Sequence, residues 1–139
     1  MSFARYCWVL SALLVGCGGD PTATDPELLY EDGFVTPAAE VKILAEGGTM
    51  VKGLDAWLKL QPVQAEIEPR KSDTYRFRDC AEPLAWFQDV TGDQELKPGY
   101  SGLLCQEAVE PRFDFDNGRW LITDRNRGIV FYRIWKKFK

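Results

Sequence analysis

Carboxylates are the main residues in this chain that could carry acid–base chemistry. The 139 residues include 21 Asp and Glu but no histidine. The lack of histidine excludes Ser-His-Asp and Cys-His nucleophile systems, histidine general bases and histidine-ligated zinc. Two carboxylates alone can hydrolyse a glycosidic bond. The candidates for such a pair are Asp73, Asp79, Glu82, Asp114 and Asp116.

Solvated surface acids are the favoured interpretation of these five carboxylates, because a sugar cleft needs a larger scaffold than a domain of about 100 residues. No glycine-rich phosphate-binding loop occurs in the sequence either. We therefore expect no catalytic residues and no cofactor.

One acidic segment places oxygen ligands at alternate positions, as the start of a calcium-binding loop does. It contains Asp89, Asp93 and Glu95. It departs from that pattern at its sixth position, where Gln94 replaces glycine, and at its twelfth, where Tyr100 replaces glutamate. No metal site is expected, and calcium at this segment is the weaker alternative.

The N-terminus has the pattern of an export signal. Arg5 precedes an apolar run over residues 6–15, which is shorter than the about 20 residues that a membrane-spanning helix needs. The run ends in Leu14-Val15-Gly16-Cys17. This ending resembles the lipobox of bacterial lipoproteins, in which an aliphatic residue, a small or branched residue and Gly or Ala precede the cysteine.

The lipoprotein resemblance implies that residues 1–16 are a signal peptide cleaved before Cys17. In that family the cysteine thiol carries a diacylglycerol and the new N-terminus is usually acylated, and two or more acyl chains anchor a protein stably in a membrane. In the sorting rule of enteric-type bacteria, Asp directly after the cysteine favours the inner membrane, whereas here Gly18 follows and Asp20 comes later. The resemblance thus implies the outer membrane, facing the periplasm, with the inner membrane and the cell surface as alternatives.

The mature chain divides into a tether and one domain. Residues 17–40 combine the lipidated cysteine with a segment rich in Gly, Pro, Asp and Thr, which favours a flexible tether, although Leu28, Leu29 and Tyr30 could dock on the domain as a short turn. Residues 41–139 are predicted to form one globular domain. In an oxidising compartment Cys80 and Cys105 are expected to form a disulfide, the alternative being two buried thiols.

Apolar alternation predicts the strands, and the sequence around Pro83 predicts a short helix over residues 81–90 that Asp79 or Cys80 could cap and that ends at Gly92. Residues 46–48 are predicted to form a turn. The segment 129–135 is apolar on both faces and is expected to be buried on both sides. The predicted strands cover residues 41–45, 51–62, 63–68, 74–80, 99–106, 119–123 and 129–135.

These elements favour an α+β fold, a small antiparallel β-sheet with one short helix and a C-terminal β-hairpin. An all-β sandwich or barrel is the alternative.

Positive charge is concentrated at the C-terminus. After residue 117 there are seven basic residues and one acid, against nine basic and 20 acidic residues over positions 18–117. Arg133, Lys136, Lys137 and Lys139, interleaved with aromatic residues, are candidates for a surface that contacts anionic lipid, lipopolysaccharide or an acidic partner. The favoured alternative is that these charges complement the chain's own acidic part while the aromatic residues form core.

The expected function is that of a lipid-anchored cell-envelope lipoprotein whose domain is a non-enzymatic binding or interaction module. Its expected partners are the membrane, through acyl chains on Cys17, and an envelope protein; nucleic acid is excluded by the location. One alternative is an inhibitor or protective factor against an extracellular hydrolase, toxin or phage. The other is a small carboxylate-dependent hydrolase.

Overall fold

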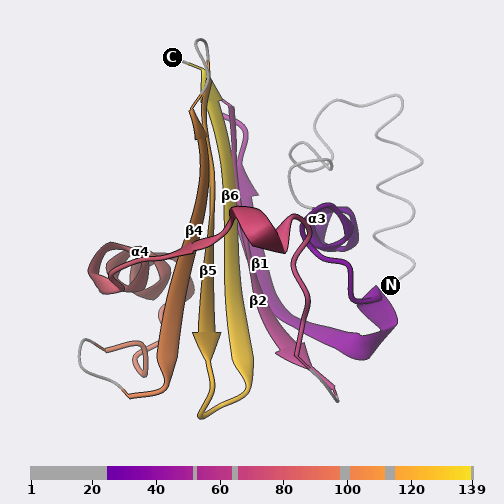
Figure 1. Ribbon diagram of the computed structural model, residues 1–139, viewed down its shortest axis with the longest axis vertical. Coiled ribbons are helices and arrows are strands. Elements are labelled where there is room, and N and C mark those ends of the chain that lie inside the picture. The colour runs from indigo at the N-terminus through magenta and orange to yellow at the C-terminus, as the bar shows by residue number, and fades with distance from the viewer. Residues whose placement is uncertain (1–24, 52, 64–65, 98–100, 112–114, 139) are drawn as a thin grey trace, which may run out of the picture.

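A computed structural model describes residues 25–139, except 52, 64–65, 98–100, 112–114 and 139. Its strands form one antiparallel sheet in the order β1-β2-β6-β5-β4-β3. The helices α3 and α4 lie on opposite faces of this sheet (Figure 1). The predicted α+β class, with its antiparallel sheet and C-terminal hairpin, is confirmed. The elements are α3 (Pro26–Gly33), η1 (Ala38–Glu40), β1 (Val41–Thr49), β2 (Gly53–Pro62), η2 (Ser72–Thr74), β3 (Arg76–Phe77), α4 (Ala81–Thr91), β4 (Leu103–Pro111), β5 (Phe115–Asp124) and β6 (Ile129–Phe138).

The strand β6 lies between β2 and β5 and is buried on both faces, as its continuous apolar sequence predicts. Tyr132 and Ile134 belong to the core on the α3 side. Phe131 and Trp135 belong to the core on the α4 side. Successive side chains of a strand point to opposite faces, so this one strand supplies both cores.

The helix α3 forms within the segment that was expected to be tether. The carboxylate of Asp25 accepts hydrogen bonds from the backbone N–H groups of Glu27 and Leu28, and a proline follows at the first helical position. Tyr30 and Phe34 are only 1% exposed, and their rings stack with centroids 4.9 Å apart. Tyr30 and the partly buried Leu29 dock on the domain as predicted, but they do so from a helix instead of a short turn, and Leu28 is exposed. A tether that extends to residue 40 is wrong, because residues 26–33 form this helix.

The predicted turn over residues 46–48 is also wrong, because β1 continues through it to Thr49. Gly47 pairs with Trp57 on β2. A Cβ atom on Gly47 would lie 2.6 Å from the indole Nε1 of Trp57, which no real side chain tolerates. The glycine therefore makes room for the Trp57 ring within the strand, instead of turning the chain.

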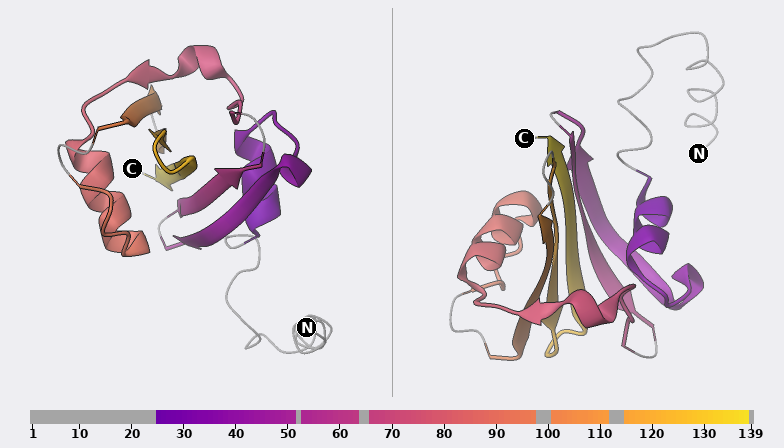
Figure 2. Two further views of the ribbon diagram at one scale, coloured as in Figure 1. Left: turned by 90° about the horizontal axis from the view of Figure 1, so that it is seen from below. Right: turned by 45° about the horizontal axis from the view of Figure 1, so that its top comes forward.

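Residues 63–75, which we call the crossing segment, lead from the end of β2 across the α3 face of the sheet to β3 at its far edge (Figures 1 and 2). The predicted strand over residues 63–68 is wrong. Since β1 and β6 already occupy both edges of β2, no edge remains there for a third partner. The segment is tied instead to the α3–β1 connection: the N–H of Val35 donates to the carbonyl of Glu68 at 2.8 Å, and that of Arg70 to the carbonyl of Gly33 at 2.9 Å.

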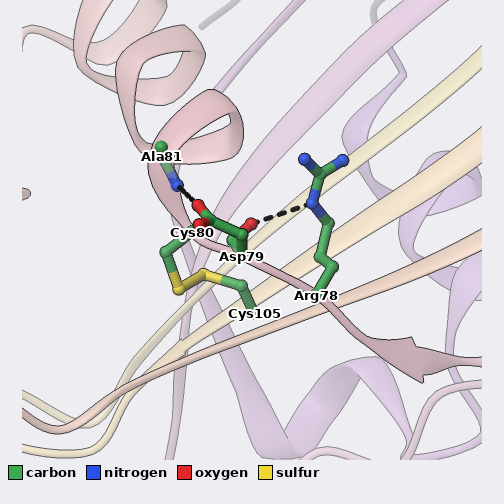
Figure 3. Close-up of a disulfide and its surroundings, with 5 residues drawn as sticks. All are labelled: Arg78, Asp79, Cys80, Ala81 and Cys105. Atoms are coloured by element: carbon green, nitrogen blue, oxygen red, sulfur yellow. Dashed lines mark hydrogen bonds between the residues drawn. A yellow bond between two sulfur atoms is a disulfide. The ribbon is translucent and has the colours of Figure 1, made fainter.

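The far end of the crossing segment is fixed on β4. The predicted strand over residues 74–80 shortens to Arg76–Phe77, and the N–H of Arg78 donates to the carbonyl of Cys105 at 3.0 Å. Cys80 and Cys105 form the predicted disulfide, with their Cα atoms 5.4 Å apart (Figure 3).

The helix α4 confirms the predicted helix. The carboxylate of Asp79 accepts from the N–H of Ala81 at 2.6 Å, and Gly92 ends the helix in the left-handed conformation. The strands β4 and β6 run longer than predicted at their C-terminal ends, and β5 begins four residues earlier than predicted. The strand β4 begins at Leu103, and residues 99–100 of its predicted start lie outside the described residues.

Candidate functional site

The structure does not place Arg133 on the basic surface that the sequence predicted. Arg133 is 8% exposed, and its Nε and Nη2 donate to the two carboxylate oxygens of Asp55 at 2.9 and 2.8 Å. Its guanidinium carbon lies 4.0 Å from the ring centroid of Trp86, 4.6 Å from that of Trp120 and 4.8 Å from that of Trp135. Planar guanidinium groups stack well on aromatic rings. Arg133 is therefore a core residue of the α4 side.

Lys136 and Lys137 of that prediction are exposed at the end of β6, and Lys139 lies outside the described residues. The Nζ atom of Lys137 lies 3.3 Å from a carboxylate oxygen of Asp55. Lys137, which carries part of the C-terminal positive charge, thus forms an ion pair with an acid of the same chain.

The calcium alternative at Asp89, Asp93 and Glu95 does not fit the structure. The buried carboxylate of Asp93 lies 3.1 Å from Lys59 Nζ and 3.0 Å from Arg127 Nη1, so protein cations already fill the place of a metal ion. Glu95 also contacts Arg127, at 3.4 Å, and Asp89 is exposed on α4. Among the residues described, no three His, Cys, Asp or Glu side chains are grouped so as to hold a metal ion.

The pKa of Asp93 reflects this pairing. Burial by itself raises the pKa of the carboxyl, but hydrogen bonds from the backbone of Glu95 and from Lys59 and Arg127 outweigh it and hold the pKa below its ordinary value. Asp93 is therefore a charged structural group.

The candidate carboxylate pairs are dispersed. Four of the five candidates are exposed: Asp73 on η2, Asp79 just before α4, Glu82 on α4 and Asp116 on β5. Asp114 lies outside the described residues.

A cavity of about 730 Å³, which we call the crossover cavity, lies between the sheet and the crossing segment. Its floor includes Leu104, Leu121 and Val130, from the three strands β4, β5 and β6. The crossing segment contributes Ile67 and Pro69 to its wall. The cavity exists because the segment is tied down at both ends, to the α3–β1 connection and to β4, while the sheet passes beneath it.

One end of the crossover cavity is polar. Arg125 and Arg127, from the turn between β5 and β6, line it together with Asp124. Nε of Arg127 donates to the fully buried carboxylate of Asp124, and Nη1 donates to Asp93. Nη2 of Arg127 is buried with no hydrogen-bond partner among the described residues. Arg127 is therefore a structural cation, and Arg125 is the exposed cation at this end of the cavity.

The sequence did not predict this cavity, because one wall comes from a segment whose alternation favours a strand. Of the residues that the sequence did single out, Arg133, Asp93 and the two disulfide cysteines are structural, and most of the other described ones are exposed. Cys17, the predicted lipidation site, lies outside the described residues.

None of the helices in the described ranges is long and apolar enough to cross a membrane. Comparisons of the chain with protein-family models, with curated proteins and with solved structures give no match.

Proposed function

We propose that this chain is a lipid-anchored protein of the bacterial cell envelope whose domain binds a small, largely apolar molecule in the crossover cavity. The proposed activity is binding, without a chemical step. The chain has no histidine, and both cysteines of the domain are joined in the disulfide.

The crossover cavity is the observation that carries the proposal. Its volume of about 730 Å³ falls in the range of small-molecule sites, roughly 300–1,000 Å³. Such sites combine an apolar lining with a few polar groups that orient the ligand. Leu104, Leu121 and Val130 supply the apolar lining, and Gln106, Thr123 and Arg125 are among the polar groups.

The position of α3 supports an address close to the membrane surface. Asp25, which caps α3, follows Cys17 by eight residues. A chain of eight residues spans at most about 29 Å even when fully extended. If Cys17 carries the acyl chains, the domain stays near the lipid headgroups, where apolar small molecules concentrate.

A fluorescence titration tests the proposed binding. Residues 17–139 with Cys17→Ser, which need no detergent, would be titrated with a dansyl-labelled fatty acid. We expect saturable binding at one site. Leu104→Trp should weaken it by about ten-fold or more, equivalent to about 1.4 kcal/mol, because the larger ring fills the cavity.

Val109→Trp is the matched control, since Val109 lies on the same strand, is exposed and does not line the crossover cavity. Its affinity should stay within about two-fold of the parent. No saturable binding, or an equal loss in both variants, would rule out the crossover cavity as the site.

A further inference from the structure

A second cavity, of about 340 Å³, lies on the α3 face of the sheet, at the opposite end of β5 and β6 from their connecting turn. Three cationic side chains line it: Lys71 from the crossing segment, Arg119 from β5 and Lys136 from β6. We call it the cationic cavity. Such a concentration of positive charge contrasts with the acidic residues that predominate over positions 18–117.

The sheet register brings the polar groups of the cationic cavity together. Asn117 on β5 pairs with Glu110 on β4 and with Lys136 on β6, so these three side chains form one row across the sheet. Arg119 follows Asn117 by two positions and therefore points to the same face. Residues from both neighbouring strands thus converge on Asn117.

Lys71 reaches the cationic cavity from a constrained backbone. Its φ of 52° is the only positive φ of a non-glycine residue in the described ranges. The carbonyl of Lys71 accepts from the backbone N–H of Thr74 at 2.9 Å and from its hydroxyl at 2.7 Å, which holds this conformation. Backbones of this kind are uncommon for residues other than glycine, and they concentrate at ligand sites.

Two acids, Glu110, which itself lines the cationic cavity, and Asp32, balance the positive charge only in part. Glu110 lies 3.8 Å from Lys71 Nζ, and Asp32 lies 3.9 Å from Arg119 Nη2, and both distances are long for an ion pair. Arg119 also donates to the hydroxyl of Tyr132 at 3.3 Å. Three cations against two loosely held acids leave an excess of positive charge.

Asn117 also lines the cationic cavity. Its Oδ1 atom is buried and has no hydrogen-bond partner among the described residues. Rotation of the amide would turn its NH₂ group toward the same space as a donor. The amide of Asn117 is therefore a polar group at the centre of the row that lines the cavity.

We propose that the cationic cavity binds a phosphate group, held by charge-assisted hydrogen bonds from Lys71, Arg119 and Lys136 and by the amide of Asn117. The guanidinium of Arg119 presents a planar pair of donors that matches the oxygens of a phosphate group. The ammonium groups of Lys71 and Lys136 add positive charge that attracts the phosphate. The phosphate can be free inorganic phosphate or part of a phospholipid headgroup, since the recognised chemistry is the same. This proposal depends neither on the anchor at Cys17 nor on the crossover cavity.

Calorimetry on the full chain in a non-ionic detergent tests the site. The two probes are inorganic phosphate and glycerophosphoglycerol, the headgroup of phosphatidylglycerol without its acyl chains. We expect saturable binding of at least one probe. The double variant Lys71→Gln/Lys136→Gln should weaken it by roughly ten-fold or more, because two charge-assisted contacts are lost. Both lysines are exposed, so this variant keeps the fold, which circular dichroism verifies.

The matched control is Lys42→Gln/Lys97→Gln, which removes the same charge at two exposed lysines that do not line the cavity. Selective binding of inorganic phosphate would identify free phosphate as the source, and selective binding of glycerophosphoglycerol would identify a lipid headgroup. Binding of both probes would establish the shared phosphate site. The proposal is overturned if neither probe binds, or if the control loses as much affinity as the test variant.

Discussion

The guanidinium of Arg133 on β6 and the carboxylate of Asp55 on β2 form a two-point ion pair, with N–O distances of 2.9 and 2.8 Å, on the α4 side of the sheet. The pair joins two residues that are 78 positions apart in sequence. Trp86, Trp120 and Trp135 surround the guanidinium, so little water reaches it. Three of the five tryptophans of the chain therefore pack around this one cation.

Asp55→Ala should destabilise the fold strongly, because it leaves the charge of Arg133 buried without its partner. Breaking a buried pair costs about 3–5 kcal/mol, and we expect the lower end since Asp55 keeps some solvent contact. Urea unfolding followed by tryptophan fluorescence measures the change. Lys137→Gln is the control, because exposed Lys137 also contacts Asp55 but should cost less than about 1 kcal/mol. Equal effects of the two variants would contradict the buried character of the pair.

The disulfide should contribute substantially to stability, because it fixes the start of α4 to β4. The sequence separation of 25 between Cys80 and Cys105 gives an expected loss of roughly 3–4 kcal/mol in the double variant Cys80→Ala/Cys105→Ala. Urea unfolding of the parent with and without reductant provides the same comparison by a second route. An unfolding midpoint that neither the variant nor the reductant changes would argue against this role.

Stability should fall at alkaline pH through the buried tyrosines. Burial, together with the negative charge of Glu40, raises the pKa of Tyr30 to about 12. Burial raises the pKa of Tyr132 to about 12 as well, although the positive charge of Arg119 opposes this shift. Burial also raises the pKa of Tyr75. Above about pH 10 the unfolded chain loses phenol protons that the folded chain keeps, so the stabilisation is complete below pH 10 and declines toward pH 12.

Urea unfolding at about pH 9 and pH 11 would measure that decline, and tyrosinate absorbance of the native protein would follow the titration itself. Tyr132→Phe should reduce the pH dependence. Native tyrosines that all titrate near the ordinary value of 10 would contradict the burial of these side chains.

Replacing Cys17 tests the proposed anchor. The parent chain should fractionate with membranes and incorporate labelled palmitate, because acyl chains on the cysteine hold it there. Cys17→Ser should abolish the label and give an uncleaved or soluble product. Ser11→Ala, a change elsewhere in the signal segment, should behave like the parent. A Cys17→Ser protein that still needs detergent for extraction after normal processing would refute the anchor.

The parts of the fold that follow strong local patterns could be predicted from the sequence. Residues 129–135 are apolar on both faces because β6 separates two cores, and the loop before them has the glycine typical of a hairpin. The helix at Ala81–Thr91 and its glycine end follow from capping and spacing. The two domain cysteines leave one pairing for the disulfide.

The missed features depend on contacts between distant residues. Gly47 has the local sequence of a turn, but in the fold it lies against the ring of Trp57. Residues 63–68 have the alternation of a strand, but in the fold both edges of β2 are already occupied. The helix α3 had a local signal, the sequence Asp25-Pro26-Glu27, but the surrounding polar composition favoured a tether. Both cavities arise from the path of the crossing segment, which no local pattern reveals.

Nuclear Overhauser effects can locate a bound fatty acid within the domain. The measurement would use unlabelled lauric acid and an isotope-labelled chain of residues 17–139 with Cys17→Ser, and it would record contacts between the ligand and the methyl groups of the protein. If the crossover cavity is the binding site, the ligand should contact the methyl groups of Leu104, Leu121 and Val130. Contacts confined to methyl groups of the α4 side, such as those of Leu84 and Ile122, would contradict it, and so would the absence of any contact at saturating lauric acid.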